Sequence, residues 1–368
     1  MSTVQDPLRR TALYDAHKRL GARLVPFGGF EMPVQYSSIL KEHNAVRERA
    51  GLFDLSHMGQ FLLEGENVGG WADALTVNAV SSMKPFQARY NIFCNDNGGA
   101  HDDVIFYRLP DRWLLIVNAS NAQKMWDHLN AHVSSSGIKL TNLHGTNSLI
   151  AIQGPKSASM LSPAVDANLS GMKYYSCTHA SVYGYPAIVA RTGYTGEDGF
   201  ELFVQSDCAV AIWDKLLSEK EVDGLEPAGL GARDVLRLEA GMPLYGHEMD
   251  EEITPIQAGL DWAVKFSKPQ FIGKDALQRQ KVADTYRRVA GLILPGRAPA
   301  REGYPVIFDG RSVGEIRSGS LGPSVGNRNI ATALVEKDAA NTGQTVRVEI
   351  RGTAYDAHVV PLPFYKRR

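Results

Sequence analysis

The sequence has few cysteines and no arrangement that would gather them. Its three cysteines, Cys94, Cys177 and Cys208, are widely spaced, and no two form a CxxC pair. An odd number of scattered cysteines argues against a disulfide scaffold and a zinc site, and it favours a reducing compartment. The ten histidines form no HExxH motif. We therefore expect a protein without a bound metal.

Long apolar runs are also missing. The chain has no stretch of about 18 consecutive apolar residues, so the sequence predicts no membrane-spanning helix. The first ten residues are polar and lack the apolar core of a secretory signal, and they do not resemble an Arg- and Ser-rich transit peptide. We expect a bacterial cytoplasmic protein, or a protein of the mitochondrial matrix if the chain is a mature organellar form.

Neither sign of charge is in excess. Lysine and arginine number 39 against 40 aspartate and glutamate residues, which gives a formal net charge of -1. No overall field favours nucleic acid or an anionic membrane, although a local basic patch is compatible with this balance. We expect neither nucleic acid nor a membrane as a partner.

The 368 residues suffice for two or three domains, and the pattern is α+β rather than alternating βαβ. Helices are predicted at 39–49 and 228–240, and a loop rich in aromatics at 27–33. Residues 52–63 are predicted as one strand, and 90–117 as three strands joined by turns. From residue 289 onward, short predicted strands are separated by turn residues, which predicts a small β-barrel or sandwich. Its short strands are expected at 290–294, 304–308, 312–319, 329–336, 345–350 and 355–362.

A glycine turn and two adjacent carboxylates open one of these strands. Gly98-Gly99 precede Asp102 and Asp103. Because strand side chains alternate between faces, Asp103 shares its face with Ile105 and Tyr107. Asp102 points to the other face and is expected to serve the turn or a neighbouring strand. An acid beside an aliphatic side chain and a tyrosine suits a flat ligand with polar edges, whereas the structural alternative is a hairpin with two solvated aspartates.

A second acid follows a second group of glycines. The run Gly193–Gly199 precedes Glu201, which lies in a predicted strand. The run lacks the ending and the strand-to-helix context of a phosphate loop, so a tight connection between strands is the alternative. Two such acids suit two edges of one heterocycle. Arg233, in the predicted helix 228–240, suits a carboxylate ligand, although a solvated helix face is the usual explanation of such a charge.

Other candidate residues are equally compatible with structural roles when read singly. This holds for Met58, Tyr90 and Asn118. His43 and His57 are more typical of packed or capping residues than of metal ligands. Ser56-His57 has no third partner at a readable spacing, so the sequence does not support a hydrolase triad.

Several longer motifs follow one another along nearly the whole chain. They are FDLSHMG at 53–59, DD at 102–103, QGP at 153–155, the run at 191–201, the segment 227–242, YGHEMDE at 245–251 and PFY at 363–365. In this order they closely resemble the aminomethyltransferase family, the T-protein of the glycine cleavage system.

The resemblance implies three domains in a cloverleaf around a central channel for tetrahydrofolate, with a small C-terminal β-barrel. The implied boundaries are 1–52 with 140–270 for a discontinuous α+β domain, 53–139 for a second α+β domain and 285–368 for the barrel. Glu201 and Arg233 would belong to the first domain and Asp103 to the second.

Carried over residue by residue, the resemblance implies that Asp103 is the key acid near the reacting folate nitrogens and that Glu201 binds the pterin edge. The side chain of Met58 and the backbone near Leu62 would lie beneath the ring. The residues implied to line the folate cavity are Met58, Leu62, Tyr90, Ile105, Tyr107, Asn118, Tyr174, Tyr194, Arg233 and Trp262. Some family members carry an aromatic residue after Glu239, where this chain has Gly241-Met242, so the pocket wall departs from the family there.

The implied reaction moves a one-carbon unit from S-aminomethyl-dihydrolipoyl H-protein to tetrahydrofolate, giving 5,10-methylenetetrahydrofolate, ammonia and dihydrolipoyl H-protein. A carboxylate in a cavity can help to deprotonate a folate nitrogen and to stabilise an iminium-like carbon. The alternatives are a tetrahydrofolate-dependent S- or O-demethylase and a non-catalytic folate-binding assembly factor of the same fold. The pair Asp103 and Glu201, with Arg233, favours an enzyme. We expect a monomer whose partners are lipoylated H-protein and tetrahydrofolate.

Overall fold

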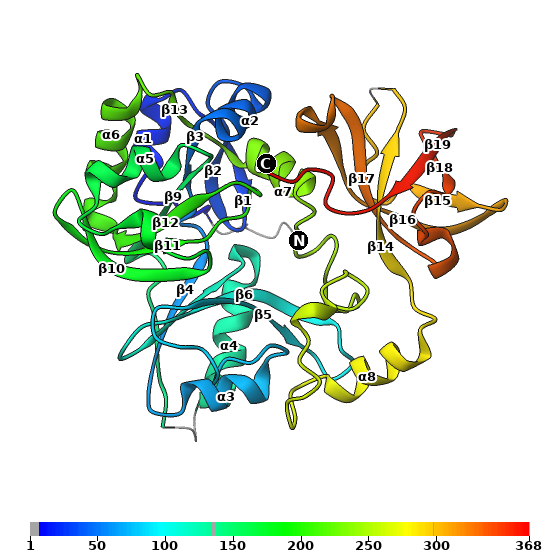
Figure 1. Ribbon diagram of the computed structural model, residues 1–368, viewed down its shortest axis with the longest axis horizontal. Helices are drawn as coiled ribbons and strands as arrows, with labels where there is room; N and C mark the ends of the chain where they lie inside the picture. The colour runs from blue at the N-terminus through cyan, green and yellow to red at the C-terminus, as the bar shows by residue number, and fades with distance from the viewer. Residues whose placement is uncertain (1–6, 134–136, 297, 368) are drawn as a thin grey trace.

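Two open sheets and a closed barrel surround the middle of the molecule, as Figure 1 shows for the computed structural model. The structure describes residues 7–133, 137–296 and 298–367. The polar start of the chain, on which the prediction of no secretory signal rests, lies mostly outside these ranges. Within them, no helix is both long and apolar enough to cross a membrane.

The six-stranded sheet combines segments that precede and follow the other open sheet in the chain. Its order is β10-β11-β12-β9-β3-β13, and its core is built around the fully buried Trp213. The strands are β3 (Ala50–Asp54), β9 (Asn147–Gln153), β10 (Ser176–Val182), β11 (Tyr185–Arg191), β12 (Gly199–Gln205) and β13 (Leu225–Pro227). The elements associated with this sheet are α1 (Tyr14–Arg19), the hairpin β1 (Arg23–Phe27) and β2 (Phe30–Gln35), α2 (Ile39–Glu48), α5 (Ser157–Leu161), α6 (Ser206–Lys220) and α7 (Leu230–Glu239).

The five-stranded sheet has the order β5-β6-β7-β4-β8. Phe61, Phe93 and Phe106 point to one face, where they form a core with residues of two helices. The strands are β4 (Gly59–Glu64), β5 (Ala88–Cys94), β6 (Ala100–Arg108), β7 (Trp113–Val117) and β8 (Lys139–Asn142). The helices are α3 (Val68–Leu75) and α4 (Ala122–Val133).

The two open sheets share a core between them. Tyr107 and Leu114 of the five-stranded sheet pack in one cluster with Leu149 and Phe203 of the six-stranded sheet. The rings of Tyr107 and Phe203 meet edge to face at 5.1 Å between centroids. Burying aromatic and aliphatic surface in this cluster fixes the two sheets against each other.

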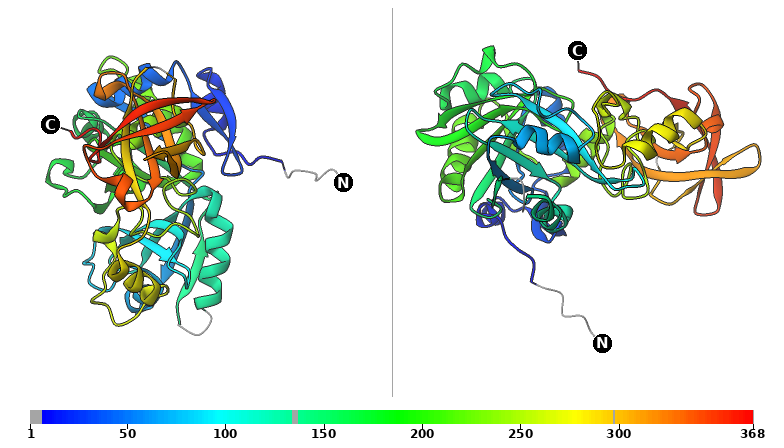
Figure 2. Two further views of the ribbon diagram at one scale, coloured as in Figure 1. Left: turned by 90° about the vertical axis from the view of Figure 1, so that its right-hand side faces the viewer. Right: turned by 90° about the horizontal axis from the view of Figure 1, so that it is seen from below.

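The barrel closes in the order β14-β17-β16-β15-β18-β19 and stands to one side of the two sheets (Figure 2). Its strands are β14 (Arg288–Leu294), β15 (Pro305–Phe308), β16 (Arg311–Gly322), β17 (Arg328–Val335), β18 (Thr345–Ile350) and β19 (Thr353–Val360). A linking segment with α8 (Lys274–Ala283) leads into it. The short 3-10 helices are η1 (Ala119–Asn121), η2 (Ser162–Ala164), η3 (Leu169–Gly171), η4 (Asp261–Ala263), η5 (Pro323–Val325) and η6 (Lys337–Ala340).

The end of the chain returns from the barrel to α7 (Figure 1). The backbone N–H of Tyr365 donates to the carbonyl oxygen of Glu239 at 2.8 Å. The Tyr365 ring also lies 4.0 Å from the guanidinium carbon of Arg47. The barrel is therefore tied to the six-stranded unit through its tail as well as through its linker.

The α+β class, the three strands in 90–117 and the closed barrel are confirmed. The single strand predicted at 52–63 is wrong: β3 ends at Asp54, β4 begins at Gly59, and the two lie in different sheets. The side chain of Asp54 accepts the backbone N–H of Ser56 at 2.8 Å and so stabilises the break. The aromatic loop at 27–33 is also wrong, because β1 and β2 pair as a hairpin around Gly28-Gly29.

The domain boundaries stay a prediction, and the sheets favour moving two of them. All of β3 belongs to the six-stranded sheet, although the predicted boundary divides it after residue 52. All of β8 pairs with β4, although the predicted boundary falls after residue 139. We propose 59–142 for the unit of the five-stranded sheet.

Candidate active site

A cavity of about 430 Å³ lies where both open sheets meet α7 and the segment 241–262. The predicted site residues that line it share this position although they come from distant parts of the chain. They are Met58, Tyr90, Asp103, Ile105, Tyr107, Asn118, Tyr194, Glu201, Arg233 and Trp262. Gly241 and Met242, where the sequence departs from the family pattern, also form part of the wall.

Asp103 reaches the cavity from β6, on the face shared with Ile105 and Tyr107, as the strand alternation predicts. The Tyr90 hydroxyl donates to Asp103 Oδ2 at 3.0 Å, and Asn118 Nδ2 donates to Asp103 Oδ1 at 2.7 Å. Burial raises the pKa of the Asp103 carboxyl above its usual range, although these two hydrogen bonds oppose the shift. The carboxylate is therefore held in one orientation and has enhanced basicity.

Asp102 points away from the cavity and is fully buried, with 0% exposure. Its carboxylate accepts the backbone N–H of Asn118 at 3.2 Å and the Nδ2 atoms of Asn118 and Asn121 at 2.8 and 2.7 Å. Asp102 was expected to serve the turn or a neighbouring strand; its partners instead lie just after β7, at Asn118, and in η1, at Asn121. Burial and the adjacent charge of Asp103 raise the pKa of Asp102 to about 7.

Glu201 faces the same cavity from β12 of the other sheet. Its Oε2 atom accepts hydrogen bonds from the Tyr107 hydroxyl at 2.9 Å and from Thr192 Oγ1 at 2.5 Å. Tyr107 thus connects the two sheets at the floor of the cavity. Within the described residues no hydrogen bond involves Glu201 Oε1, which leaves that oxygen free to accept from a ligand.

Arg233, in the first turns of α7, contributes a cation to the wall. Its guanidinium carbon lies 4.7 Å from the centroid of the Tyr194 ring. Among the described residues this guanidinium has no hydrogen-bond acceptor and no acidic group within ion-pair distance, although Glu201 lies within electrostatic reach and favours its charged form. By contrast, Arg237 on the same helix pairs with Glu248 at 3.0 Å and with Asp234 at 2.7 Å. Burial lowers the pKa of Arg233 from its usual value.

Aromatic side chains form much of the remaining wall. Tyr90 and Trp262 are stacked, with centroids 5.9 Å apart and an interplanar angle of 29°. Trp262 is 56% exposed and marks an opening of the cavity. The Tyr194 hydroxyl donates to the carbonyl oxygen of Pro243, which ties the segment after α7 to the wall. The resulting space suits a planar, partly apolar ligand.

Two predicted residues do not reach the cavity. Leu62 lies in β4, paired with Leu114, and it is not among the residues that line the described cavity. Tyr174 is 44% exposed and lines a separate hollow, where the guanidinium carbon of Arg367 lies 5.5 Å from its ring. The next residue, Tyr175, faces the cavity instead. Tyr175 has a left-handed backbone (φ 60°), and the two tyrosine rings stand at 84° to each other.

Several cavity residues were not among the predicted ones. Phe27 and Gly28 enter from the tip of the β1–β2 hairpin, where a side chain on Gly28 would overlap Ala119. His57 also lines the cavity, and burial lowers its pKa to about 4, so it is neutral at physiological pH. His57 lies in the FDLSHMG motif, so the sequence did mark this segment. The hairpin residues were missed because 27–33 was predicted as a loop.

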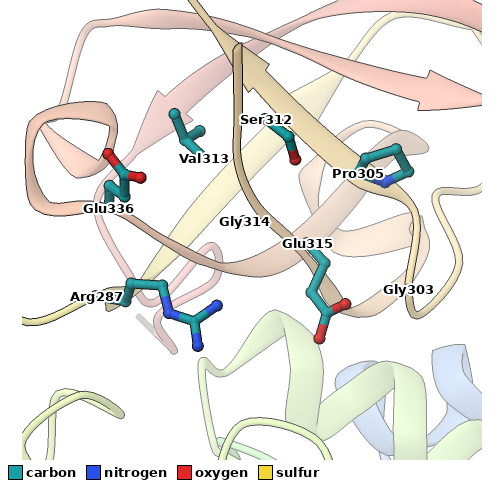
Figure 3. Close-up of a pocket in the computed structure, with 8 residues that line it drawn as sticks. All are labelled: Arg287, Gly303, Pro305, Ser312, Val313, Gly314, Glu315 and Glu336. Carbon is teal, nitrogen blue, oxygen red and sulfur yellow. The ribbon is translucent and has the colours of Figure 1, made fainter.

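Another hollow, of about 480 Å³, lies on the barrel (Figure 3). Its acidic side chains are paired: Glu336 with Arg311 at 2.5 Å, and Glu315 with Arg317 at 2.7 Å. The predicted site residues of the described chain do not line it. Within the described ranges no group of three or more His, Cys, Asp or Glu side chains is placed to hold a metal ion.

Two protein-family models match this chain, one over the part that forms the open sheets and one over the barrel. The model of the GCVT N-terminal domain matches residues 13–268. The model of the glycine cleavage T-protein C-terminal barrel domain matches residues 287–366. The chain belongs to the glycine cleavage T-protein family. The expected family and the expected aminomethyltransferase activity are thereby confirmed, and so is the barrel as its own C-terminal unit.

Individual T-proteins agree with this assignment over their whole lengths. An aminomethyltransferase of Deinococcus deserti is 46% identical over 365 residues, which is 99% of each chain. One of a Picosynechococcus species is 45% identical over 362 residues, 98% of each chain. The crystal structure of the glycine cleavage system aminomethyltransferase T from Bartonella henselae superposes with a TM-score of 0.91 at 34% identity, covering 98% of this chain and 99% of that one.

Proposed function

We propose that the cavity binds tetrahydrofolate and that Asp103 assists transfer of a one-carbon unit to it from the aminomethyl-loaded lipoyl arm of H-protein. One observation carries this proposal: the carboxylates of Asp103 and Glu201 face one cavity from two different sheets. As a T-protein family member, the chain is an aminomethyltransferase of glycine cleavage.

The charges around the cavity fit the parts of a folate. The pterin ring has N–H groups along one edge, and Glu201 Oε1 is free to accept from them. The aromatic walls, with Met58, supply apolar contact for the rings. The glutamate end of the folate carries carboxylates, and the unpaired guanidinium of Arg233 suits a bidentate contact with one of them. Withdrawing part of a cation from water without a close acidic partner is unfavourable, and a ligand carboxylate would offset that penalty.

The proposed step conserves atoms and charge. The carbon–sulfur bond of the aminomethyl lipoyl group breaks, the carbon bonds to both folate nitrogens, N5 and N10, and the amine leaves as ammonia. The two folate nitrogens lose one proton each; one proton ends on the lipoyl sulfur and the other on the amine. Asp103 is placed to accept a folate proton and to stabilise the cationic carbon that forms. Tyr90 and Asn118 hold its carboxylate in position for both.

We further propose that the donor reaches the site by docking of an acidic H-protein onto a local group of lysines and arginines. The overall charge of -1 leaves no general attraction, so such a group must supply it. We place the protein in a bacterial cytoplasm, because the relatives named above are bacterial.

The test is formation of ammonia and 5,10-methylenetetrahydrofolate from aminomethyl-loaded H-protein, measured beside S-methyl and O-methyl donors. We expect equal amounts of both products with the loaded carrier, and background rates with the methyl donors. Faster turnover of a methyl donor would replace the proposal by a demethylase. Folate binding without turnover of any donor would favour the non-catalytic assembly factor.

A further inference from the structure

The Asn118 side chain lies between two carboxylates that point to opposite faces of β6. Its Nδ2 atom donates to Asp102 Oδ1 at 2.8 Å and to Asp103 Oδ1 at 2.7 Å. The backbone carbonyl oxygen of Asp103 is a third, longer contact of this atom at 3.1 Å. An amide nitrogen has two hydrogens, and the two shortest contacts direct one towards each carboxylate. Asn118 thus joins the fully buried Asp102 to the acid that faces the cavity through two hydrogen bonds.

This arrangement fixes which way the Asn118 amide faces. With both N–H groups committed to carboxylates, rotating the amide by 180° would place its oxygen against two acids. The Asn118 carbonyl oxygen must therefore point away from them. Asn118 lines the cavity, so it can present only an acceptor to a ligand there, and an N–H group of a folate is the matching donor.

Asp102 is itself held by donors alone. It accepts the backbone N–H of Asn118 and the Nδ2 atoms of Asn118 and Asn121. Protonating Asp102 would convert one accepting oxygen into a hydroxyl that faces these N–H groups, and one of the three contacts would be lost. All three hydrogen bonds to Asp102 therefore form only when its carboxyl group is ionised.

We propose that Asp102 is a positioning residue for the transfer: acting through Asn118, it orients the carboxylate of Asp103 and keeps the Asn118 carbonyl oxygen turned towards the folate. This rests on the proposed function of Asp103 and extends it to a residue that does not touch the cavity. Ionisation of Asp102 then adds a second step to the pH dependence of turnover, close to neutrality, in addition to ionisation of Asp103.

Other titratable groups lie near the two acids or line the same cavity, among them the histidines His57 and His247. Tyr90 contacts Asp103, while Tyr175, Tyr194 and Tyr245 lie within electrostatic reach of one acid or the other. Burial raises the pKa of each of these hydroxyls above its usual value. His57 lines the same cavity and titrates near 4. Because His247 also lines the cavity and the two acids interact, the neutral step is assigned to Asp102 by its loss in Asp102→Asn.

The experiment compares Asp102→Asn with Asp73→Asn. Asp73 is a carboxylate of the same unit, in α3, which accepts the backbone N–H of Val80 and does not line the described cavity. For Asp102→Asn we expect kcat to fall about tenfold or more through misplacement of Asp103. The Kd of tetrahydrofolate should change less than the rate. The neutral step in kcat against pH should disappear. Asp73→Asn should lower the unfolding temperature and leave kcat and its pH profile as in the wild type.

Wild-type kcat and an unchanged pH profile in Asp102→Asn, with only the unfolding temperature lowered, would overturn the proposal. If that variant does not fold, NMR of the wild-type protein gives the answer. The side-chain amide signals of Asn118 should shift together as Asp102 titrates near neutral pH. Chemical shifts that stay constant over this range would contradict the proposed coupling between Asp102 and Asn118. This readout needs no turnover, so it separates failure of the positioning role from failure of the proposed function.

Discussion

Replacing Arg233 with methionine should make the empty protein more stable and its folate binding much weaker. The guanidinium is partly buried and forms no ion pair with the described residues, Glu201 acting on it only at longer range, and its main described contact is the face of the Tyr194 ring. Withdrawing it partly from water costs about 2 kcal/mol, a fraction of the penalty of a fully buried ion. The contact with Tyr194 returns about 1 kcal/mol. Methionine fills similar space, so Arg233→Met should stabilise the empty protein by about 1 kcal/mol, the difference of these two terms.

The effect on binding has the opposite sign. A charge-assisted contact between a guanidinium and a carboxylate contributes about 3 kcal/mol when both groups are withdrawn from water. Its loss should raise the Kd of tetrahydrofolate by a factor of roughly 100. Tetrahydropterin, which lacks the benzoylglutamate end, should bind wild type and Arg233→Met equally. Calorimetric titration of both ligands and thermal unfolding without ligand give all the required values.

Arg191 provides the matched control. It is also partly buried, but its guanidinium donates to Asp198 at 2.9 and 2.6 Å and to the carbonyl oxygen of Met172 at 2.7 Å. Arg191→Met removes these three hydrogen bonds and should lower stability by about 1–3 kcal/mol with unchanged folate affinity. The reasoning is refuted if Arg233→Met is destabilised like Arg191→Met, or if it binds tetrahydrofolate with wild-type affinity.

Four further predictions follow from the site and its supports. Glu201→Gln should weaken tetrahydrofolate by about 1.5–3 kcal/mol in a titration, and unchanged affinity would remove Glu201 from the pterin edge. Asp103→Asn should lower kcat by roughly 100-fold with a smaller change in folate Kd, and near-normal turnover in steady-state kinetics would exclude it as the reacting acid. Added salt should slow association with H-protein more than it speeds dissociation in stopped-flow measurements; rates independent of salt would indicate an apolar docking surface. The hydrogen bond and charge of His17 outweigh burial and lower the pKa of Asp54. The stabilisation contributed by the ionised Asp54 carboxylate should therefore be present above the unfolded pKa of about 4 and be lost as the pH falls through the lowered folded pKa. In Asp54→Asn, the unfolding midpoint should depend less steeply on pH in the acid range.

Strand alternation was sufficient to place Asp103, because a period of two residues decides the face of a side chain without knowledge of its neighbours. The same rule assigned Asp102 to the opposite face. Alternation does not say which sheet a strand joins, and so 52–63 was predicted as one strand. The break at Leu55–Met58 is stabilised by Asp54, whose partners Thr11 and His17 lie some forty positions earlier in the chain.

Which of Tyr174 and Tyr175 lines the cavity could not be predicted from the sequence, for a different reason. Two consecutive identical side chains give no pattern, and the left-handed backbone at Tyr175 arises from its surroundings. Leu62 lies in β4, which pairs with β7 on one side and with β8 on the other. Its position therefore depends on the register of these strands. The bridge formed by Asn118 was likewise unreadable, because it depends on the end of β7 lying beside the start of β6.

The returning tail has a consequence for biosynthesis. Gly241, in the cavity wall, packs against Pro363, and Glu239 pairs with the backbone of Tyr365. Translation proceeds from the N-terminus, and domains fold in that order as they emerge. Both open sheets can therefore form on the ribosome while this part of the wall still lacks its support. The nascent chain therefore completes this part of the cavity wall only after residues 363–365 have left the ribosome. A frameshift upstream of these residues would remove support from a site whose acids were encoded hundreds of nucleotides earlier.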